Sequence, residues 1–294
     1  MTGKPAANPE PDRFPPHVLR EYAVLADGER GAVVGPRGDI VWMCAPQWDN
    51  DAVFSALLDG PGGYSITSVD RFVWGGFYEE GSMIWRSRWV TNDGIIECRE
   101  ALAFPGDPHR AVLLRRVIAV RGNAAVRVDL EPRAGFGRHR LTGLDNQDAI
   151  WSGRSGGLHL RWSGAPRSAV PVDRHSGLTA DLVVPAGRYH DLVLEISDQP
   201  LPDQPPDPAE SWLATETAWA AAVPRLDACL EPRNARRSYA VLRGLTSSTG
   251  GMVATLDIDR SRCTLLTQPA DRSDSIARKT FHLHRGDTRG VLAG

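Results

Sequence analysis

The feature that most constrains the fold is an alternation of apolar and polar residues that runs, interrupted by turns, from about residue 31 to 200. The alternation is clearest in the segments 126–131, 158–162 and 192–196. Successive side chains of a strand point to opposite faces, so a period of two is typical of antiparallel strands with one buried face. Many short strands with few long helical segments among them predict an antiparallel β-sandwich.

Turn residues indicate where these strands reverse. Thr-Asn-Asp-Gly joins 82–90 to 95–100, and Asn or Gly accepts a positive φ at low cost, so these two strands are predicted to pair as a hairpin. A second hairpin is predicted between 111–120 and 124–130, which Arg-Gly-Asn joins. A short helix is predicted over 51–59.

Charge and cysteine content narrow the classes of partner. The chain has 294 residues and a formal net charge of -2, which favours neither nucleic acid nor an anionic membrane as a partner. Its four cysteines lie far apart without a C-x-x-C pair, which disfavours a zinc site and a redox motif. We therefore expect no metal, no cofactor and a reducing, cytoplasmic location. The Pro-rich segment 1–16 has no apolar core and is expected to be a disordered tail rather than a signal peptide or a membrane span.

The composition changes near residue 200. Five prolines in 199–208 cannot donate to a sheet ladder, so the sandwich is expected to cover 17–200 and a Pro-rich, helical linker to cover 201–254. Residues 255–294 have no sustained period and are expected to be poorly ordered.

Two helices are expected in the linker. The first begins at Pro208 and carries Trp212, Trp219 and Val223 on one stripe, with the two indoles docking the helix. The second is expected to run from Asn234, as its N-cap, to about residue 245, with Tyr239 and Leu242 on one side.

Three blocks, in this order and spacing, carry a family resemblance: EYAVLADGERGAVVGPRGDIVWMCAPQWDNDAVFSALLDGPGGY, GGFYEEGSMIWRSRWVTNDGIIECREALAFPGDP and SYAVLRGLTSSTGGMVA. They resemble the N-terminal domain of bacterial glycoside hydrolase family 15 proteins, the trehalase and glucoamylase-like enzymes, and most of all the actinobacterial trehalase-like branch. The resemblance covers roughly 17–254. It implies a β-sandwich of the super-sandwich type, a helical linker, and then an (α/α)6 barrel that hydrolyses α-glucosidic bonds with inversion, the substrate of that branch being α,α-trehalose.

The same resemblance implies that the catalytic carboxylates belong to the barrel. In the family GGMVA leads into Thr-Ser-Leu-Pro-Glu, whereas here Thr-Leu-Asp-Ile-Asp follows, so the barrel is expected to be missing. Inverting hydrolysis needs an acid and a base about 6.5–9.5 Å apart. Glu79 and Glu80 are neighbours whose side chains would diverge on a strand, so they do not form such a pair. No catalytic residue is predicted.

Tryptophan is the remaining candidate for sugar contact, because indole stacks on the apolar faces of sugar rings. Trp85, Trp89 and Trp162 alternate with Arg or Ser on strands and are predicted to be core or half-core residues. For Trp48 and Asp49 the resemblance implies a loop that faces the barrel, which makes them candidate substrate-binding residues at the rim of the sugar pocket. The alternative is a purely structural loop, in which Asp49 or Asp51 caps the helix over 51–59.

Three readings of function remain open. The first is the N-terminal portion of a trehalase-like glycoside hydrolase, separated from its barrel and inactive alone. The second is a stand-alone carbohydrate-binding module, which requires exposed tryptophans. The third is one half of a split enzyme that docks on a separate barrel, which requires an exposed apolar patch along Trp212, Trp219, Tyr239 and Leu242.

Overall fold

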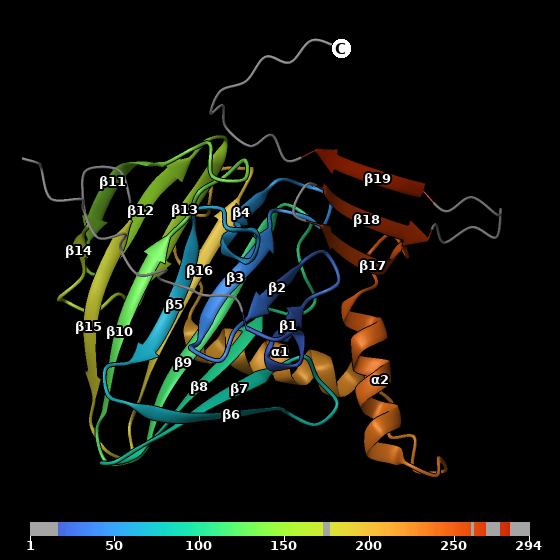
Figure 1. Ribbon diagram of the computed structural model, residues 1–294, viewed down its shortest axis with the longest axis horizontal. Coiled ribbons are helices and arrows are strands. Elements are labelled where there is room, and N and C mark those ends of the chain that lie inside the picture. The colour runs from blue at the N-terminus through green and yellow to red at the C-terminus, as the bar shows by residue number, and fades with distance from the viewer. Residues whose placement is uncertain (1–16, 173–176, 260–261, 269–276, 283–294) are drawn as a thin grey trace, which may run out of the picture.

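The computed structural model describes residues 17–172, 177–259, 262–268 and 277–282. Two eight-stranded antiparallel sheets lie face to face (Figure 1). The first contains, in spatial order, β1 (Ala23–Ala26), β2 (Gly31–Val34), β3 (Asp39–Cys44), β5 (Gly63–Ser68), β10 (Ala124–Glu131), β15 (Leu178–Val184) and β14 (Val170–Pro171), with β4 (Ala52–Phe54) paired to β3. The expected antiparallel β-sandwich is confirmed.

The second sheet carries the longer strands. Its spatial order is β11 (Leu141–Gln147), β12 (Ile150–Ser155), β13 (Leu158–Ser163), β16 (Tyr189–Ser197), β9 (Arg110–Arg121), β8 (Ile95–Leu102), β7 (Trp85–Thr91) and β6 (Phe72–Tyr78). The predicted hairpin of β7 and β8 is present, with Trp85 opposite Glu100 and Val90 opposite Ile95.

The second predicted hairpin is wrong. β9 pairs with β8 and β16 in one sheet, whereas β10 pairs with β5 and β15 in the other. The Arg-Gly-Asn turn, with Gly122 at φ 68°, therefore carries the chain across the sandwich. A period of two shows that each strand has one buried face. The same period occurs in two strands of a hairpin and in two strands that face each other across a core, so it cannot distinguish them.

The core lies between the two sheets, where the alternating apolar side chains of both inner faces meet. Trp85, Trp89 and Trp162 belong to it with exposed fractions of 9%, 0% and 1%, as predicted. A hydrogen bond fixes each indole: Trp85 Nε1 donates to the Ser87 hydroxyl, Trp89 Nε1 to the Pro36 carbonyl and Trp162 Nε1 to the Tyr64 hydroxyl. These rings are structural and do not face a ligand.

The predicted helix over 51–59 is also wrong. The segment forms β4, which pairs with the end of β3, and then one 3-10 turn, η2 (Ala56–Leu58). All three residues of β4 are buried. Burial of Ala-Val-Phe against β3 and β5 outweighs a local helical preference in a segment this short. A second 3-10 turn, η1 (Leu19–Glu21), precedes β1.

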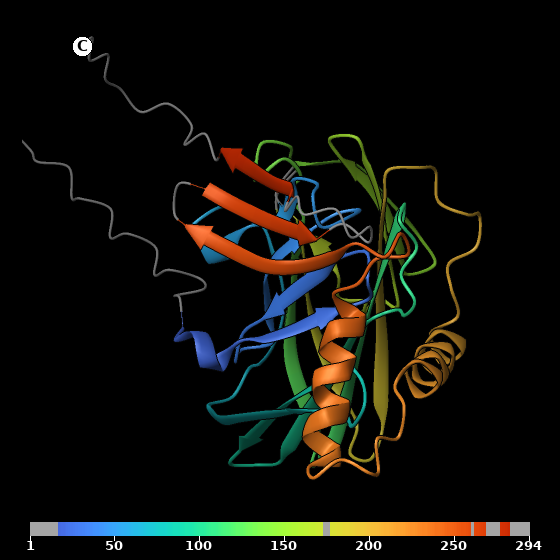
Figure 2. The ribbon, with the colours of Figure 1, turned by 90° about the vertical axis from the view of Figure 1, so that its right-hand side faces the viewer.

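Two helices follow the Pro-rich segment. α1 (Pro208–Ala222) begins as predicted, with the Asp207 carboxylate accepting a hydrogen bond from the Glu210 amide, and it lies on the outer face of the second sheet (Figure 2). α2 (Pro232–Gly244) begins two residues before the predicted N-cap, because Pro232 occupies its first turn. α2 packs beside β1 and α1.

Beyond α2 a third sheet contains β17 (Met252–Asp259), β18 (Arg262–Gln268) and β19 (Ala277–His282). These strands pair with one another in antiparallel register. β17 begins in the last residues of the predicted linker 201–254, and the rest of the sheet falls in the segment 255–294, for which no period was found in the sequence. The expected lack of order of that segment stays a prediction. The expected tail over 1–16 lies outside the described residues.

Candidate functional site

A cavity of about 310 Å³ lies between the first strands of the first sheet and α2. Its walls are almost entirely apolar, and Arg237 is the charged residue among those that line it. The lining residues are Val24, Gly31, Val33, Trp42, Trp48, Tyr78, Met83, Arg237, Val241, Leu245 and Val253. The structure therefore places one of the two predicted site residues, Trp48, in the wall of a cavity.

Local backbone contacts hold the half-buried Trp48 in this wall. Its Nε1 donates to the Gly28 carbonyl at 2.9 Å, and its amide donates to the Glu29 carbonyl at 2.9 Å. The ring lies so close to Gly31 that a Cβ at that position would be 2.2 Å from Trp48 Cη2. The glycine at the start of β2 is therefore needed to seat the indole.

Asp49 does not share this cavity. It lies half-buried in a turn in which the Gln47 amide donates to Asn50 Oδ1 and the Asn50 amide donates to the Gln47 carbonyl. Asp49 is outside the set of residues that line the cavity. The prediction that Asp49 or Asp51 caps a helix over 51–59 is wrong, because that helix does not form.

A buried charged turn lies beside Trp48 and was not predicted from the sequence. Asp27, Glu29 and Arg30 connect β1 to β2 with exposed fractions of only 2%, 3% and 0%. The Asp27 carboxylate accepts from the amides of Glu29 and Arg30 and lies 3.2 Å from Arg30 Nε. Burial raises the pKa of Asp27 to about 6, although Arg30 and the two amides act in the opposite direction.

The same turn secures the chain after α2. Glu29 Oε1 accepts from the Ser248 amide at 2.7 Å, and the Gly28 amide donates to the Gly244 carbonyl at 2.8 Å. A run of Asp, Gly, Glu and Arg between two short strands looks like a solvated turn in the sequence. Its burial arises from distant residues, because the Gly106 amide donates to the Asp27 carbonyl and the Ser248 amide donates to Glu29. No local pattern contains these contacts.

A polar groove of about 390 Å³ lies on the other side of Tyr78. It separates the turn after β6 from the first turn of α2, and Arg236 Nη1 bridges it to Glu80 Oε1 at 2.7 Å. The groove is lined by Tyr78, Glu79, Glu80, Gly81, Glu231, Arg233, Asn234 and Arg237.

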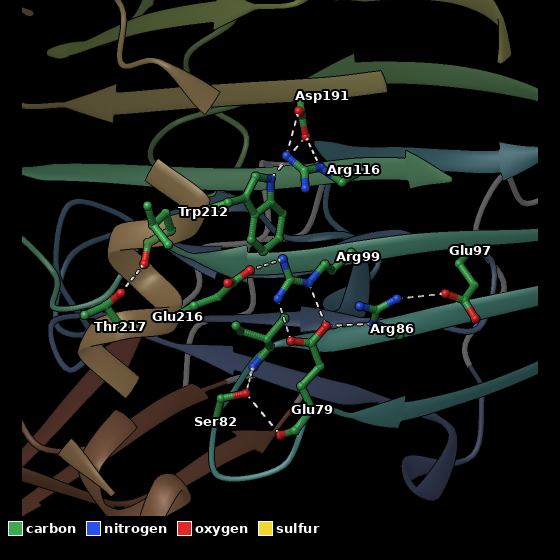
Figure 3. A network of polar contacts seen from close by, with 12 residues as sticks. Glu79, Ser82, Arg86, Glu97, Arg99, Arg116, Asp191, Trp212, Glu216 and Thr217 are labelled. Carbon is green, nitrogen blue, oxygen red and sulfur yellow. Dashed lines mark hydrogen bonds and ion pairs between the residues drawn. The ribbon is translucent and has the colours of Figure 1, made fainter. Parts of the chain in front are cut away.

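Two arginines hold the Glu79 carboxylate of this groove. Arg86 Nε and Arg99 Nε donate to Glu79 Oε1 at 2.6 Å each, and Arg99 also contacts Glu216 of α1 (Figure 3). Burial alone would raise the pKa of Glu79, but the hydrogen bonds and charges of Arg99 and Arg86 outweigh it and hold that pKa below its usual range. A general acid needs a raised pKa, so Glu79 is unsuited to that role.

Glu100 has a raised pKa, and its position excludes a sugar. It is fully buried between the sheets and pairs with Arg115, whose guanidinium also donates to the Tyr64 carbonyl. Burial is the main cause of the raised pKa of Glu100. Among the residues with described side chains, no three His, Cys, Asp or Glu gather as metal ligands. Neither α1 nor α2 has the length and apolar character of a bilayer span.

The comparisons with known proteins point to one family. A family model described as "Trehalase-like, N-terminal" matches residues 15–199. A trehalase of Mycobacterium tuberculosis is 31% identical over 165 residues, which is 48% of this chain and only 22% of that protein. The chain thus spans about a fifth of the length of this relative.

One solved structure supports the fold. A bacterial glucoamylase complexed with acarbose superposes with a TM-score of 0.50 at 8% identity, over 79% of this chain and 42% of that one. A putative kojibiose phosphorylase from the human microbiome matches 74% of this chain and 35% of its own, with a TM-score of 0.35 and 10% identity. Since the family model covers more than half of the chain and the sandwich is the fold that the resemblance implied, this chain belongs to the trehalase-like N-terminal domain family.

Proposed function

We propose that this chain is the non-catalytic β-sandwich portion of a trehalase-like glycosidase, serving the cleavage of α-glucosidic bonds by a catalytic (α/α)6 barrel and inactive alone. The family membership and the trehalase relative support the reaction class. The observation that carries the proposal is the state of the carboxylates. Glu79 is neutralised by two arginines and Glu100 is enclosed between the sheets. Neither provides the accessible acid that inverting hydrolysis requires.

The second reading, a module that binds sugar on surface tryptophans, has less support. All nine tryptophans lie in the described residues, and each is buried or half-buried. A platform for stacking a sugar chain needs an open indole face. The third reading, a split enzyme, receives partial support, because Tyr239 and Leu242 on α2 are 41% and 52% exposed whereas Trp212 and Trp219 are covered.

Glucose release from trehalose and from maltose tests the proposal directly. We expect the purified chain to release no more glucose than a heat-killed control, because two arginines hold Glu79 and Glu100 is enclosed between the sheets. The variants Glu79→Gln and Glu100→Gln serve as controls. Hydrolysis that either substitution abolished would show that the chemistry resides in the sandwich and would overturn the proposal.

The rim role of Trp48 and Asp49 is part of the same proposal. A contact at the rim binds ground state and transition state alike, so its loss raises KM and leaves kcat unchanged. We expect this pattern for Asp49→Asn and Trp48→Phe when the chain is assayed on trehalose together with a trehalase barrel. Unchanged KM in both variants would restrict these residues to a structural role.

A further inference from the structure

The apolar cavity and the polar groove share a wall. Tyr78 and Arg237 line both of them, and the Arg237 guanidinium lies 3.1 Å from the centroid of the Tyr78 ring. An apolar space of about 310 Å³ and a polar space of about 390 Å³ therefore adjoin each other at one stacked pair. Each is within the size range of small-molecule sites, which starts near roughly 300 Å³.

The shared wall is fixed from the apolar side. The Tyr78 hydroxyl accepts from the Val24 amide at 2.6 Å and donates to the Val24 carbonyl at 3.0 Å. The Tyr78 ring also packs edge-on against Trp85, with centroids 4.6 Å apart. Arg237 comes from α2 and forms the other half of the wall by stacking on the ring.

The groove offers hydrogen-bonding groups that the protein itself does not use. Glu231, Arg233 and Asn234 have no side-chain partner among the described residues, and Glu231, the N-cap of α2, makes no capping bond. Together they provide donors and acceptors within one concave surface. Hydroxyl groups, which both donate and accept, match such a mixture.

The charge of the groove separates neutral from anionic ligands. Three carboxylates, Glu79, Glu80 and Glu231, line it against the two guanidinium groups of Arg233 and Arg237. Arg86 and Arg99 hold Glu79, and Arg236 holds Glu80, so an anionic head group would compete with these carboxylates for their arginines. A neutral polyhydroxyl head would use the unpaired groups without breaking an ion pair.

We propose that the two spaces form one site for a neutral amphiphilic glycoside, with the sugar head in the polar groove and an alkyl or aryl group in the apolar cavity beside Trp48. This recessed site differs from stacking on surface tryptophans and does not depend on a catalytic barrel. Arg237 marks the point at which the head meets the tail.

Calorimetric titration of the full chain with n-octyl glucoside, below the concentration at which it forms micelles, tests the proposal. Methyl glucoside supplies the head alone, and octyl phosphate supplies the tail with an anionic head. We expect octyl glucoside to bind at least about tenfold tighter than methyl glucoside, since burial of even two methylenes corresponds to roughly that factor. Octyl phosphate should also bind more weakly than octyl glucoside, because its head would compete with Glu79 and Glu80 for their arginines. Equal affinity for octyl and methyl glucoside, or no saturable binding, would overturn the proposal.

Two substitutions on α2 provide a matched pair. Val241 lines the cavity, whereas its neighbour Leu242 is 52% exposed. Val241→Phe should fill the cavity and weaken octyl glucoside binding about tenfold or more, and Leu242→Phe should leave it within about twofold. Asn234→Ala, in the groove, should weaken binding of octyl glucoside, whereas Ser238→Ala, at an exposed position of α2 outside the groove lining, should not. Equal affinities of the Val241 and Leu242 variants would place the tail elsewhere and refute the site.

A measurement on the unaltered protein covers the case in which Val241→Phe does not fold. At saturating octyl glucoside, protons of the alkyl chain should give nuclear Overhauser contacts to the indole of Trp48. These contacts should disappear in Trp48→Phe. Contacts only to other tryptophans, such as Trp74 or Trp151, would overturn the assignment.

Discussion

α1 and α2 follow each other in the chain and relate to the sandwich in different ways. α1 buries Trp212 and Trp219 to 2% exposure each on the outer face of the second sheet. α2 leaves Tyr239 and Leu242 exposed on its outer side and an apolar cavity on its inner side. α1 is thus closely packed as a layer of the sandwich, whereas a cavity remains between α2 and the sandwich. Close packing, rather than adjacency in the sequence, decides which helix belongs to the core.

The polar contacts reinforce the same difference. Beneath α1, Arg116 makes two hydrogen bonds to the Asp191 carboxylate at 2.7 and 2.9 Å, and Trp212 Nε1 donates to the same group at 3.1 Å (Figure 3). Arg99 lies over the Trp212 ring at 4.4 Å from its centroid. The ion pair of α2, Arg236 with Glu80, is partly open to water, with side chains 27% and 54% exposed. Exposed pairs contribute little, so packing and polar contacts favour α1 together.

Substitution of Trp219 should have the largest effect. Its ring stacks on Phe104 with centroids 3.9 Å apart, and Trp219→Ala would leave a large void in that layer. We expect a loss of about 3–5 kcal/mol in the free energy of unfolding, measured by urea denaturation. Leu242→Ala on α2 should stay within about 0.5 kcal/mol. Equal losses would show that the two helices are integrated alike.

The turn that supports the end of α2 should respond to pH. Folding raises the pKa of Asp27 from 3.8 to about 6, so between these values the folded chain binds more protons than the unfolded chain. Stability therefore falls as pH rises through this window, by up to about 3 kcal/mol. Asp27→Asn should remove the fall in urea unfolding measured from pH 4 to 6.5. A persistent fall in that variant would assign the titration to another group.

The polar anchor of α1 should matter more than that of α2. Asp191→Asn removes the charge that Arg116 and the Trp212 indole share, and we expect a loss of about 2 kcal/mol. Glu80→Gln breaks the exposed Arg236 pair and should cost less than about 1 kcal/mol. Thermal unfolding of both variants at neutral pH provides the measurement. A reversed order would mean that the ion pair of α2 carries its docking.

The smallest expected effect is the acid response of the α1 network. The pKa of Glu79 is lowered in the folded chain, so its contribution is present above its ordinary value of 4.5 and is lost as pH falls through the lower folded value. Stability should decline on acidification below about pH 4.5, opposite in direction to the Asp27 effect. Glu79→Gln should flatten this decline in the same urea series, and an unchanged acid limb would exclude Glu79 as its source.

Part of the candidate site could be predicted from the sequence. Pro-Gln-Trp-Asp singled out Trp48, and the structure places its ring in a cavity wall. The other walls come from β1, β2, β3, β6, α2 and β17, and no sequence pattern predicts that these elements meet. The charged turn at Asp27 and the polar groove at Glu231 were not predicted for the same reason. In a sequence, charged residues between regular elements are interpreted as solvated, and only the tertiary structure shows that a distant segment covers them.

The sequence by itself determined the elements: strands with one buried face from period two, a proline-rich boundary, and a helix at Pro208 whose two indoles needed a surface. These follow from the geometry of a few neighbouring residues. Only the tertiary structure decided that β9 and β10 lie in opposite sheets and that 51–59 contains a strand. It also decided that Tyr78 and Arg237 separate the apolar cavity from the polar groove. Such choices depend on which distant surfaces exclude water together, and local periodicity carries no information about distant partners.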